Sequence, residues 1–120
     1  MWGSTAICGT RGWSIPHSES VGEDKKIYDR ERQRLLLSLE AAKALNPERI
    51  LTLMHFPPLE REEISVGFLD IMEQYGVDEC IFGHLHASAH GAAPQGVICG
   101  VKMRLTACDY LDFTPCLIEG

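Results

Sequence analysis

The 120-residue chain lacks the features that mark membrane, secreted and nucleic-acid-binding proteins. No apolar run approaches the roughly 20 residues that span a bilayer, and the N-terminal stretch has neither the charged nor the apolar region of a secretory signal. With 11 Lys and Arg against 17 Asp and Glu, the net charge of −6 disfavours an extended phosphate-binding surface. We therefore expect a soluble cytoplasmic protein with no membrane partner and no clear nucleic-acid surface.

A disulfide framework is also lacking, because the five cysteines are odd in number and form no C-x-x-C pair. Three of them lie within short apolar runs, where a thiol packs as a small hydrophobic side chain. These are Cys8, Cys80 and Cys99. We expect all three to be buried and none to be a catalytic nucleophile, since no cationic partner is recognisable in the sequence.

What the sequence does contain is an alternation of short apolar runs and longer stretches of helical periodicity. Continuous apolar runs predict strands that are covered on both faces, and these are residues 4–8, 49–55 and 78–83. Apolar residues spaced by three and four predict helices at 24–45 and 62–75. This order predicts an α/β fold built on a parallel βαβαβ unit, with residues 1–120 forming one domain.

The pattern changes after residue 90, where short β-type runs follow one another with no helix between them. They are "GVICGV" (96–101), "RLTAC" (104–108) and "FTPCLI" (113–118). Short strands joined by turns favour antiparallel pairing. In the longer helix upstream, we expect the core-facing residues to be Tyr28, Leu35, Leu36, Leu39, Ala42 and Leu45.

Three histidines follow two of the predicted buried strands. His55 ends the run "ILTLMH", and His84 and His86 lie in "GHLHA". Because strands joined by a right-handed crossover are parallel, both runs should end at the same edge of the sheet. That edge is where ligands bind in open α/β sheets, and imidazole is a common metal ligand. The sequence predicts that the three rings converge on a metal, the alternative being hydrogen-bonded turn residues.

Four other residues belong to loops expected at or near this edge. The guanidinium of Arg11 could pair with a substrate phosphate in a bidentate manner, or it could be a solvated or structural group. His17 and His90 could donate a proton to a leaving group, and Trp13 could stack on a flat part of a substrate. For these three residues, a structural role is the favoured interpretation.

The block "GHLHA" after a buried strand, preceded by "LTLMHFPP", resembles the last two signature blocks of the calcineurin-like metallophosphoesterases. The stretches "ICGTRGW" and "CDYLDF" resemble flanking segments in a bacterial branch of predicted phosphohydrolases. The resemblance implies a metallophosphoesterase-type αββα sandwich and hydrolysis of phosphate mono- or diesters at two Mn, Fe or Zn ions. It also implies that His55 and His84 bind the second metal and that His86 reaches the first.

The family's N-terminal blocks do not occur in this sequence. There is no Asp-x-His, no Gly-Asp-x-x-Asp and no Gly-Asn-His followed by Asp or Glu. We therefore expect the chain to be the C-terminal half of a metallophosphoesterase domain, with little activity alone and with one zinc ion or none. It should form a homo-oligomer or associate with the missing N-terminal half.

Two alternative functions remain open. One is a self-contained zinc hydrolase built on the three histidines, because three neutral imidazoles can hold one zinc ion and leave a position for water. The other is a non-catalytic binding or assembly module that retains half of the fold.

Overall fold

The computed structural model describes residues 2–13, 22–58, 67–84 and 96–106, together with Leu111, Pro115, Leu117 and Ile118. Strands and helices alternate along the first three of these ranges, and two further strands follow. In chain order the elements are β1 (Thr5–Thr10), α1 (Gly22–Lys43), β2 (Arg49–Met54), α2 (Phe68–Gln74), β3 (Glu79–Phe82), β4 (Gly96–Ile98) and β5 (Val101–Leu105). The predicted α/β class is confirmed.

The strands form one sheet in the order β1-β2-β3-β5-β4. The pairs β1–β2, β2–β3 and β3–β5 are parallel, and only the edge strand β4 is antiparallel to its neighbour β5. The predicted βαβαβ unit and antiparallel pairing after residue 90 are therefore confirmed, but the strand bounds differ. The first predicted run holds β4 and the first residue of β5, and β5 ends at Leu105 in the second run. The parallel pairing of β5 with β3 was not expected. Of the third run, Pro115, Leu117 and Ile118 are described and none lies in a strand.

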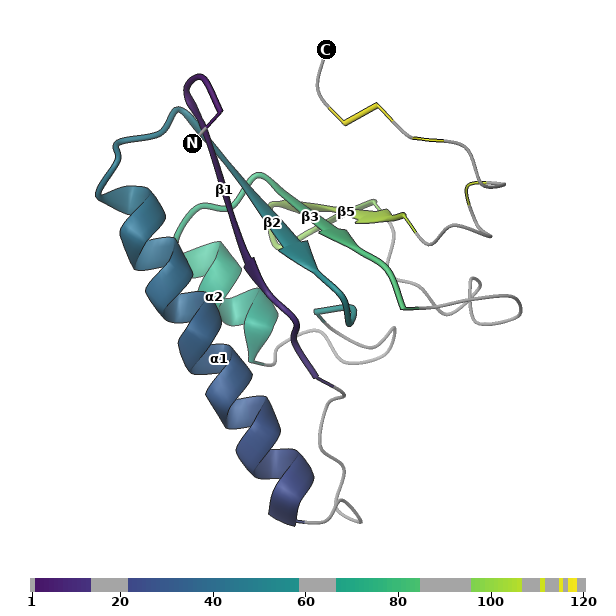
Figure 1. The fold of residues 1–120 in the computed structure, drawn as a ribbon. Coiled ribbons are helices and arrows are strands. Elements are labelled where there is room, and N and C mark those ends of the chain that lie inside the picture. The colour runs from purple at the N-terminus through teal and green to yellow at the C-terminus, as the bar shows by residue number, and fades with distance from the viewer. Residues whose placement is uncertain are drawn as a thin grey trace.

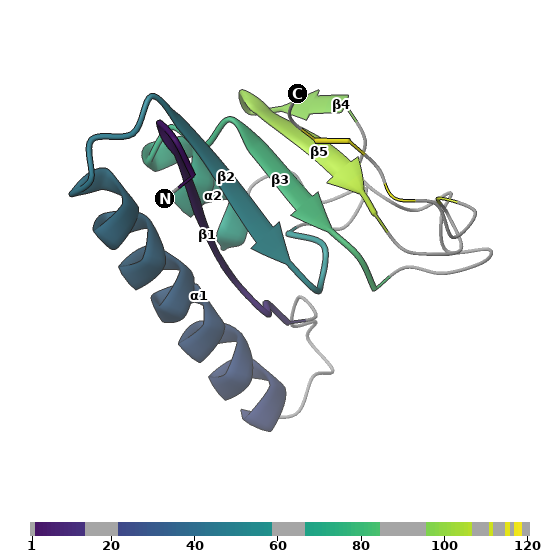
Figure 2. The same cartoon turned by 45° about the horizontal axis from the view of Figure 1, so that its top comes forward.

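Both helices lie on the same face of the sheet (Figures 1 and 2). This follows from the strand order, because two right-handed crossovers that advance in the same direction place their helices on one side. Each crossover also returns the chain in the same direction, so β1, β2 and β3 all end at one edge of the sheet. Neither helix has the length and apolar character of a membrane-spanning segment.

The helix α1 forms as its sequence predicts, except at its C-terminal end. Acidic residues lie in its first turn and Lys43 lies in its last, which suits the helix dipole. The chain leaves the helix before Asn46, whose φ of 50° is left-handed, and the Pro47 that follows disfavours helical backbone at the preceding residue. Leu45, expected to face the core, therefore lies beyond the helix and is exposed.

The hydrophobic core lies between the helices and the face of the sheet that they cover. Its largest fully buried side chains include Phe68 of α2, Phe82 of β3, Leu35 and Leu39 of α1, and Leu105 of β5. Alternate residues of each strand point to this side, as the two-residue period of a strand requires. Burying side chains of this size stabilises a fold by roughly 1.5–3 kcal/mol each before entropy is subtracted.

The opposite face of the sheet is not covered by either described helix. Leu51 and Ile81 are buried there, but Ile7, Leu53 and Val97 are 50%, 46% and 71% exposed. The same face holds a buried carboxylate, that of Glu79 in β3. Two guanidinium groups pair with it: Arg104 Nε at 2.7 Å and Arg49 Nη2 at 3.4 Å. We call this surface the helix-free face.

Candidate metal centre

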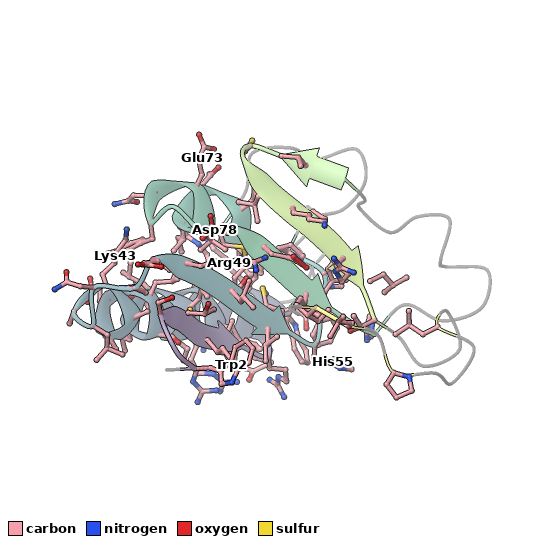
Figure 3. All side chains as sticks on the ribbon, turned by 90° about the horizontal axis from the view of Figure 1, so that it is seen from above. Trp2, Lys43, Arg49, His55, Glu73 and Asp78 are labelled. Atoms are coloured by element: carbon pink, nitrogen blue, oxygen red, sulfur yellow. The ribbon has the colours of Figure 1, made fainter. Side chains whose placement is uncertain are left out.

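The structure brings two of the three predicted metal ligands together at the edge where the parallel strands end. His55 directly follows β2, and His84 lies two residues after β3. The ring atoms His84 Nδ1 and His55 Nε2 are 3.1 Å apart, and both side chains are exposed. Figure 3 shows His55 near the arrowheads of the strands. His86 lies outside the described residues.

The distance between these ring nitrogens fits two kinds of interaction. Two nitrogen ligands of one tetrahedral zinc ion, each bound at about 2.0–2.1 Å, lie about 3.3 Å apart. A hydrogen bond between a neutral donor ring and a neutral acceptor ring has nearly the same length. The pair His55 and His84 is therefore spaced to share one borderline cation without a large rearrangement.

Within the part of the chain that the structure describes, no third His, Cys, Asp or Glu joins this pair to form a group able to hold a metal. Two adjacent hard cations require anionic oxygen ligands to offset their mutual repulsion. The described residues thus fit two nitrogen ligands of a single ion, and they do not supply the carboxylates of a two-metal centre.

The backbone of His84 is held in an uncommon conformation. Its φ of 69° is left-handed, which costs an L-residue about 1–2 kcal/mol, although His adopts it more often than most residues. The preceding Gly83 donates its N–H to the carbonyl oxygen of His55, at 3.2 Å, and so joins the two strand exits. Such strain persists where the surrounding structure maintains it, and it is common at binding sites. Here it accompanies the close approach of the two rings.

Phe56 links the histidine pair to the end of β1. Its ring centroid lies 4.2 Å from that of His84, 5.1 Å from that of His55 and 5.2 Å from that of Trp13. Its backbone N–H donates to the carbonyl oxygen of Arg11 at 3.0 Å. Phe56 was not among the predicted site residues, although its place between a strand-ending His and two prolines is recognisable in the sequence.

Trp13 has a structural partner on α1. Its Nε1 donates to Oδ1 of Asp24 at 3.2 Å, and its ring packs at the border of the hydrophobic core. The indole is thus fixed at the carboxyl edge, with its ring between the core and the loop that carries Phe56.

Arg11, the predicted phosphate ligand, lies on the other side of this aromatic row. The carbon atom of its guanidinium is 4.8 Å from the Trp13 ring centroid, within the range of a cation–π interaction. Its Nη2 is 3.7 Å from Oε1 of Glu31, and about half of its side chain is exposed. The guanidinium therefore has donors directed to solvent as well as a partner in the protein.

Glu31 of α1 is a fully buried carboxylate that was not among the predicted site residues. The hydroxyl of Thr10 donates to Oε2, while Arg34 and Arg30 approach Oε1 at 2.9 Å and 3.4 Å. Burial alone would raise the pKa of Glu31, but the Thr10 hydrogen bond and the charges of Arg34 and Arg11 outweigh it, so the pKa is lowered. Its position three residues after Tyr28 and four before Leu35 is the signal, because that spacing lies on the buried face of the helix.

Two of the three cysteines expected to be buried are so. Burial raises the pKa of Cys8 to about 11 and that of Cys80 to about 12, which makes both thiols poor nucleophiles. The expectation was wrong for Cys99, which is exposed. It lies in the turn between β4 and β5 with a φ of 51°, where an apolar run is interrupted by backbone that must reverse direction.

The remaining candidates, His17 and His90, lie outside the described residues, so their predicted positions stay predictions. The candidate centre in the described part of the chain consists of two histidine rings in contact, an aromatic row beside them, and Arg11 at the end of that row. Comparisons with protein-family models, with curated proteins and with solved structures find no match to this chain.

Proposed function

We propose that this chain carries the histidine half of a metal-dependent phosphoesterase site, within the C-terminal half of a metallophosphoesterase domain. The observation that supports this most is the 3.1 Å separation of His84 Nδ1 and His55 Nε2 at the carboxyl edge of the sheet. Two imidazoles at the ends of adjacent parallel strands lie where α/β proteins bind ligands. The "GHLHA" and "LTLMHFPP" blocks that contain them are the ones that resemble the family.

In this proposal His55 and His84 bind one divalent cation, and His86 reaches the other metal of the complete two-metal site. When bound, such a cation polarises a phosphoryl oxygen and lowers the pKa of a coordinated water, so that hydroxide is available near neutral pH. Arg11 would pair with a phosphate group of a mono- or diester substrate through its solvent-facing donors. Because the bridging carboxylates are lacking in the sequence, we expect only trace hydrolysis by this chain alone, in a cytoplasmic setting.

The helix-free face supports the half-domain interpretation. In an αββα sandwich each sheet has helices on its outer face and the second sheet on its inner face. Here the described helices cover one face only, while Ile7, Leu53 and Val97 are exposed on the other. We propose that a second sheet covers this surface, contributed by the N-terminal half of the domain or by another copy of the chain.

Isothermal titration calorimetry of the chelator-treated chain with zinc tests the proposal. One zinc ion should bind per chain, and the affinity should fall at least about tenfold in His84→Ala and in His55→Ala, because each variant removes one of the few ligands. Cys99→Ser is the matched control, since it removes the exposed thiol and should leave zinc binding unchanged. Equal zinc affinity in the wild type and in both histidine variants would refute the proposed centre.

Activity separates the alternatives. Metal-dependent turnover of an aryl phosphate by the homogeneous chain, abolished in His84→Ala, would favour the self-contained zinc hydrolase. Trace activity that rises on addition of a separately expressed N-terminal half would favour the half-domain. Metal binding with no activity under either condition would favour the binding or assembly module.

A further inference from the structure

Three arginine side chains converge on a single buried carboxylate at the end of the aromatic row. Arg11 comes from the exit of β1, and Arg30 and Arg34 come from α1, on either side of Glu31. Their guanidinium nitrogens lie 3.7, 3.4 and 2.9 Å from Oε1 of Glu31. We call these three residues the arginine cluster.

The arginine cluster has more positive charge and more hydrogen-bond donors than Glu31 can satisfy. Three guanidiniums and one carboxylate leave a formal charge of +2. Each guanidinium has five N–H groups in a planar arrangement that matches the oxygens of a phosphate. The three side chains are between 49% and 58% exposed, whereas that of Glu31 is only 1% exposed. The buried carboxylate thus holds the three guanidiniums together, and their N–H groups that point away from Glu31 remain accessible to solvent.

The arginine cluster lies at the same edge of the sheet as the two histidines. The carbonyl oxygen of Arg11 accepts the hydrogen bond from the N–H of Phe56, the residue that follows His55. The rings of Trp13 and Phe56 connect the Arg11 guanidinium to the His84 ring through successive contacts of 4.8, 5.2 and 4.2 Å. Beside this row, the carboxylate of Asp24 accepts the hydrogen bond from Trp13 Nε1.

We propose that Arg11, Arg30 and Arg34 form an anion subsite that binds a second phosphate group, carried by the leaving group of the substrate. The rings of Trp13 and Phe56, between the subsite and the histidines, would then contact the part of the substrate that joins the reacting phosphate to the second phosphate. The substrate class is therefore a phosphate ester with a second phosphate group, instead of a simple alkyl or aryl monophosphate. This assignment of a substrate rests on the proposed function, but phosphate binding by the arginine cluster does not.

Calorimetric titration of the metal-free full chain with inorganic pyrophosphate, at low ionic strength and in the presence of a chelator, tests the subsite. The wild type should bind pyrophosphate, and inorganic phosphate should compete for the same site. Arg30→Gln and Arg34→Gln should each weaken binding by roughly fivefold to tenfold, since each removes one charge-assisted donor set. Lys43→Gln is the matched control, because it removes the same charge from the last turn of α1, away from the arginine cluster in the middle of the helix, and should change the affinity less than about twofold.

Two additional variants make the outcome decisive. Arg34→Lys keeps the charge but loses the planar guanidinium, so it should bind pyrophosphate with an affinity between those of the wild type and Arg34→Gln. Because this variant keeps the charge at position 34, it also separates loss of the guanidinium from loss of the fold. His84→Ala should bind pyrophosphate as the wild type does while losing affinity for zinc, which separates failure of the subsite from failure of the metal centre. No binding of pyrophosphate by the wild type would overturn the inference, as would equal weakening by Lys43→Gln and Arg34→Gln.

Discussion

Replacing Glu31 with Gln should lower the free energy of unfolding by about 2 kcal/mol near neutral pH, a value that follows from the partners of its carboxylate. The Thr10 hydrogen bond to a buried charge contributes about 1.5–3 kcal/mol, and a neutral amide acceptor would retain only about 1 kcal/mol of it. The three arginine pairs add only about 0.2–1 kcal/mol each, because the guanidiniums are half exposed and screened by solvent. Part of this total is offset, because a buried amide costs less to desolvate than a buried carboxylate.

The effect of this substitution should depend on pH in a defined direction. The pKa of Glu31 is lowered in the folded protein, so its contribution to stability is present above the unfolded-state pKa of about 4.3. That contribution is lost as the pH falls through the lower, folded-state pKa. The difference in stability between the wild type and Glu31→Gln should therefore be full near neutral pH and shrink in acid.

Urea unfolding followed by circular dichroism, at neutral pH and at a series of acidic pH values, measures both effects. Glu40→Gln is the control, since the carboxylate of Glu40 is exposed on the same helix and accepts a hydrogen bond from the Tyr75 hydroxyl at 3.2 Å. It should change the stability by less than about 0.5 kcal/mol. A loss in Glu31→Gln that is equally small, or one that stays constant as the pH falls, would show that Glu31 is not the buried anionic partner of the arginines.

Three further predictions concern β1, the helix-free face and the cysteines. A Cβ on Gly9 would lie 2.1 Å from the Leu53 carbonyl oxygen, so Gly9→Ala should cost about 1–3 kcal/mol in thermal or urea unfolding, whereas Gly22→Ala, with open space around it, should cost nothing. Sedimentation of the wild type should show self-association that depends on concentration, and a monomeric wild type would refute the oligomer. Leu53→Lys should weaken this association about tenfold, whereas Leu37→Lys, on the exposed side of α1, should leave it intact. Among the described thiols, Cys99 alone should react with iodoacetamide in the native protein, as peptide mapping would reveal.

The elements that the sequence predicted well are those with a local signal. The continuous apolar runs at 49–55 and 78–83 and the helical spacing from Tyr28 to Ala42 depend only on neighbours in the chain, and each corresponds to an observed element. The parallel pairing of β5 with β3 depends on contacts between distant segments. The spacing of apolar residues in 101–105 does not distinguish a strand that pairs in parallel with β3 from a strand of an antiparallel meander.

The candidate site was predictable to a similar extent. Right-handed crossovers place the ends of β2 and β3 at one edge, so the approach of His55 and His84 follows from topology. The buried position of Glu31 does not follow from its residue type, because a charged side chain in a helix is normally solvated. Only the arginines around it and the Thr10 hydroxyl make its burial favourable. Two of these partners, Thr10 and Arg11, come from the last residue of β1 and the residue that follows it.

The most direct test of the metal centre is the nitrogen-15 NMR spectrum of the histidine rings, recorded without zinc and with one equivalent of zinc. His55 Nε2 and His84 Nδ1 lie 3.1 Å apart, and we propose that this pair of nitrogens binds a single ion. We predict that both resonances shift together and reach saturation at one zinc ion per chain. Resonances of these two nitrogens that stay unchanged at saturating zinc, or a shift confined to other ring nitrogens, would contradict the account.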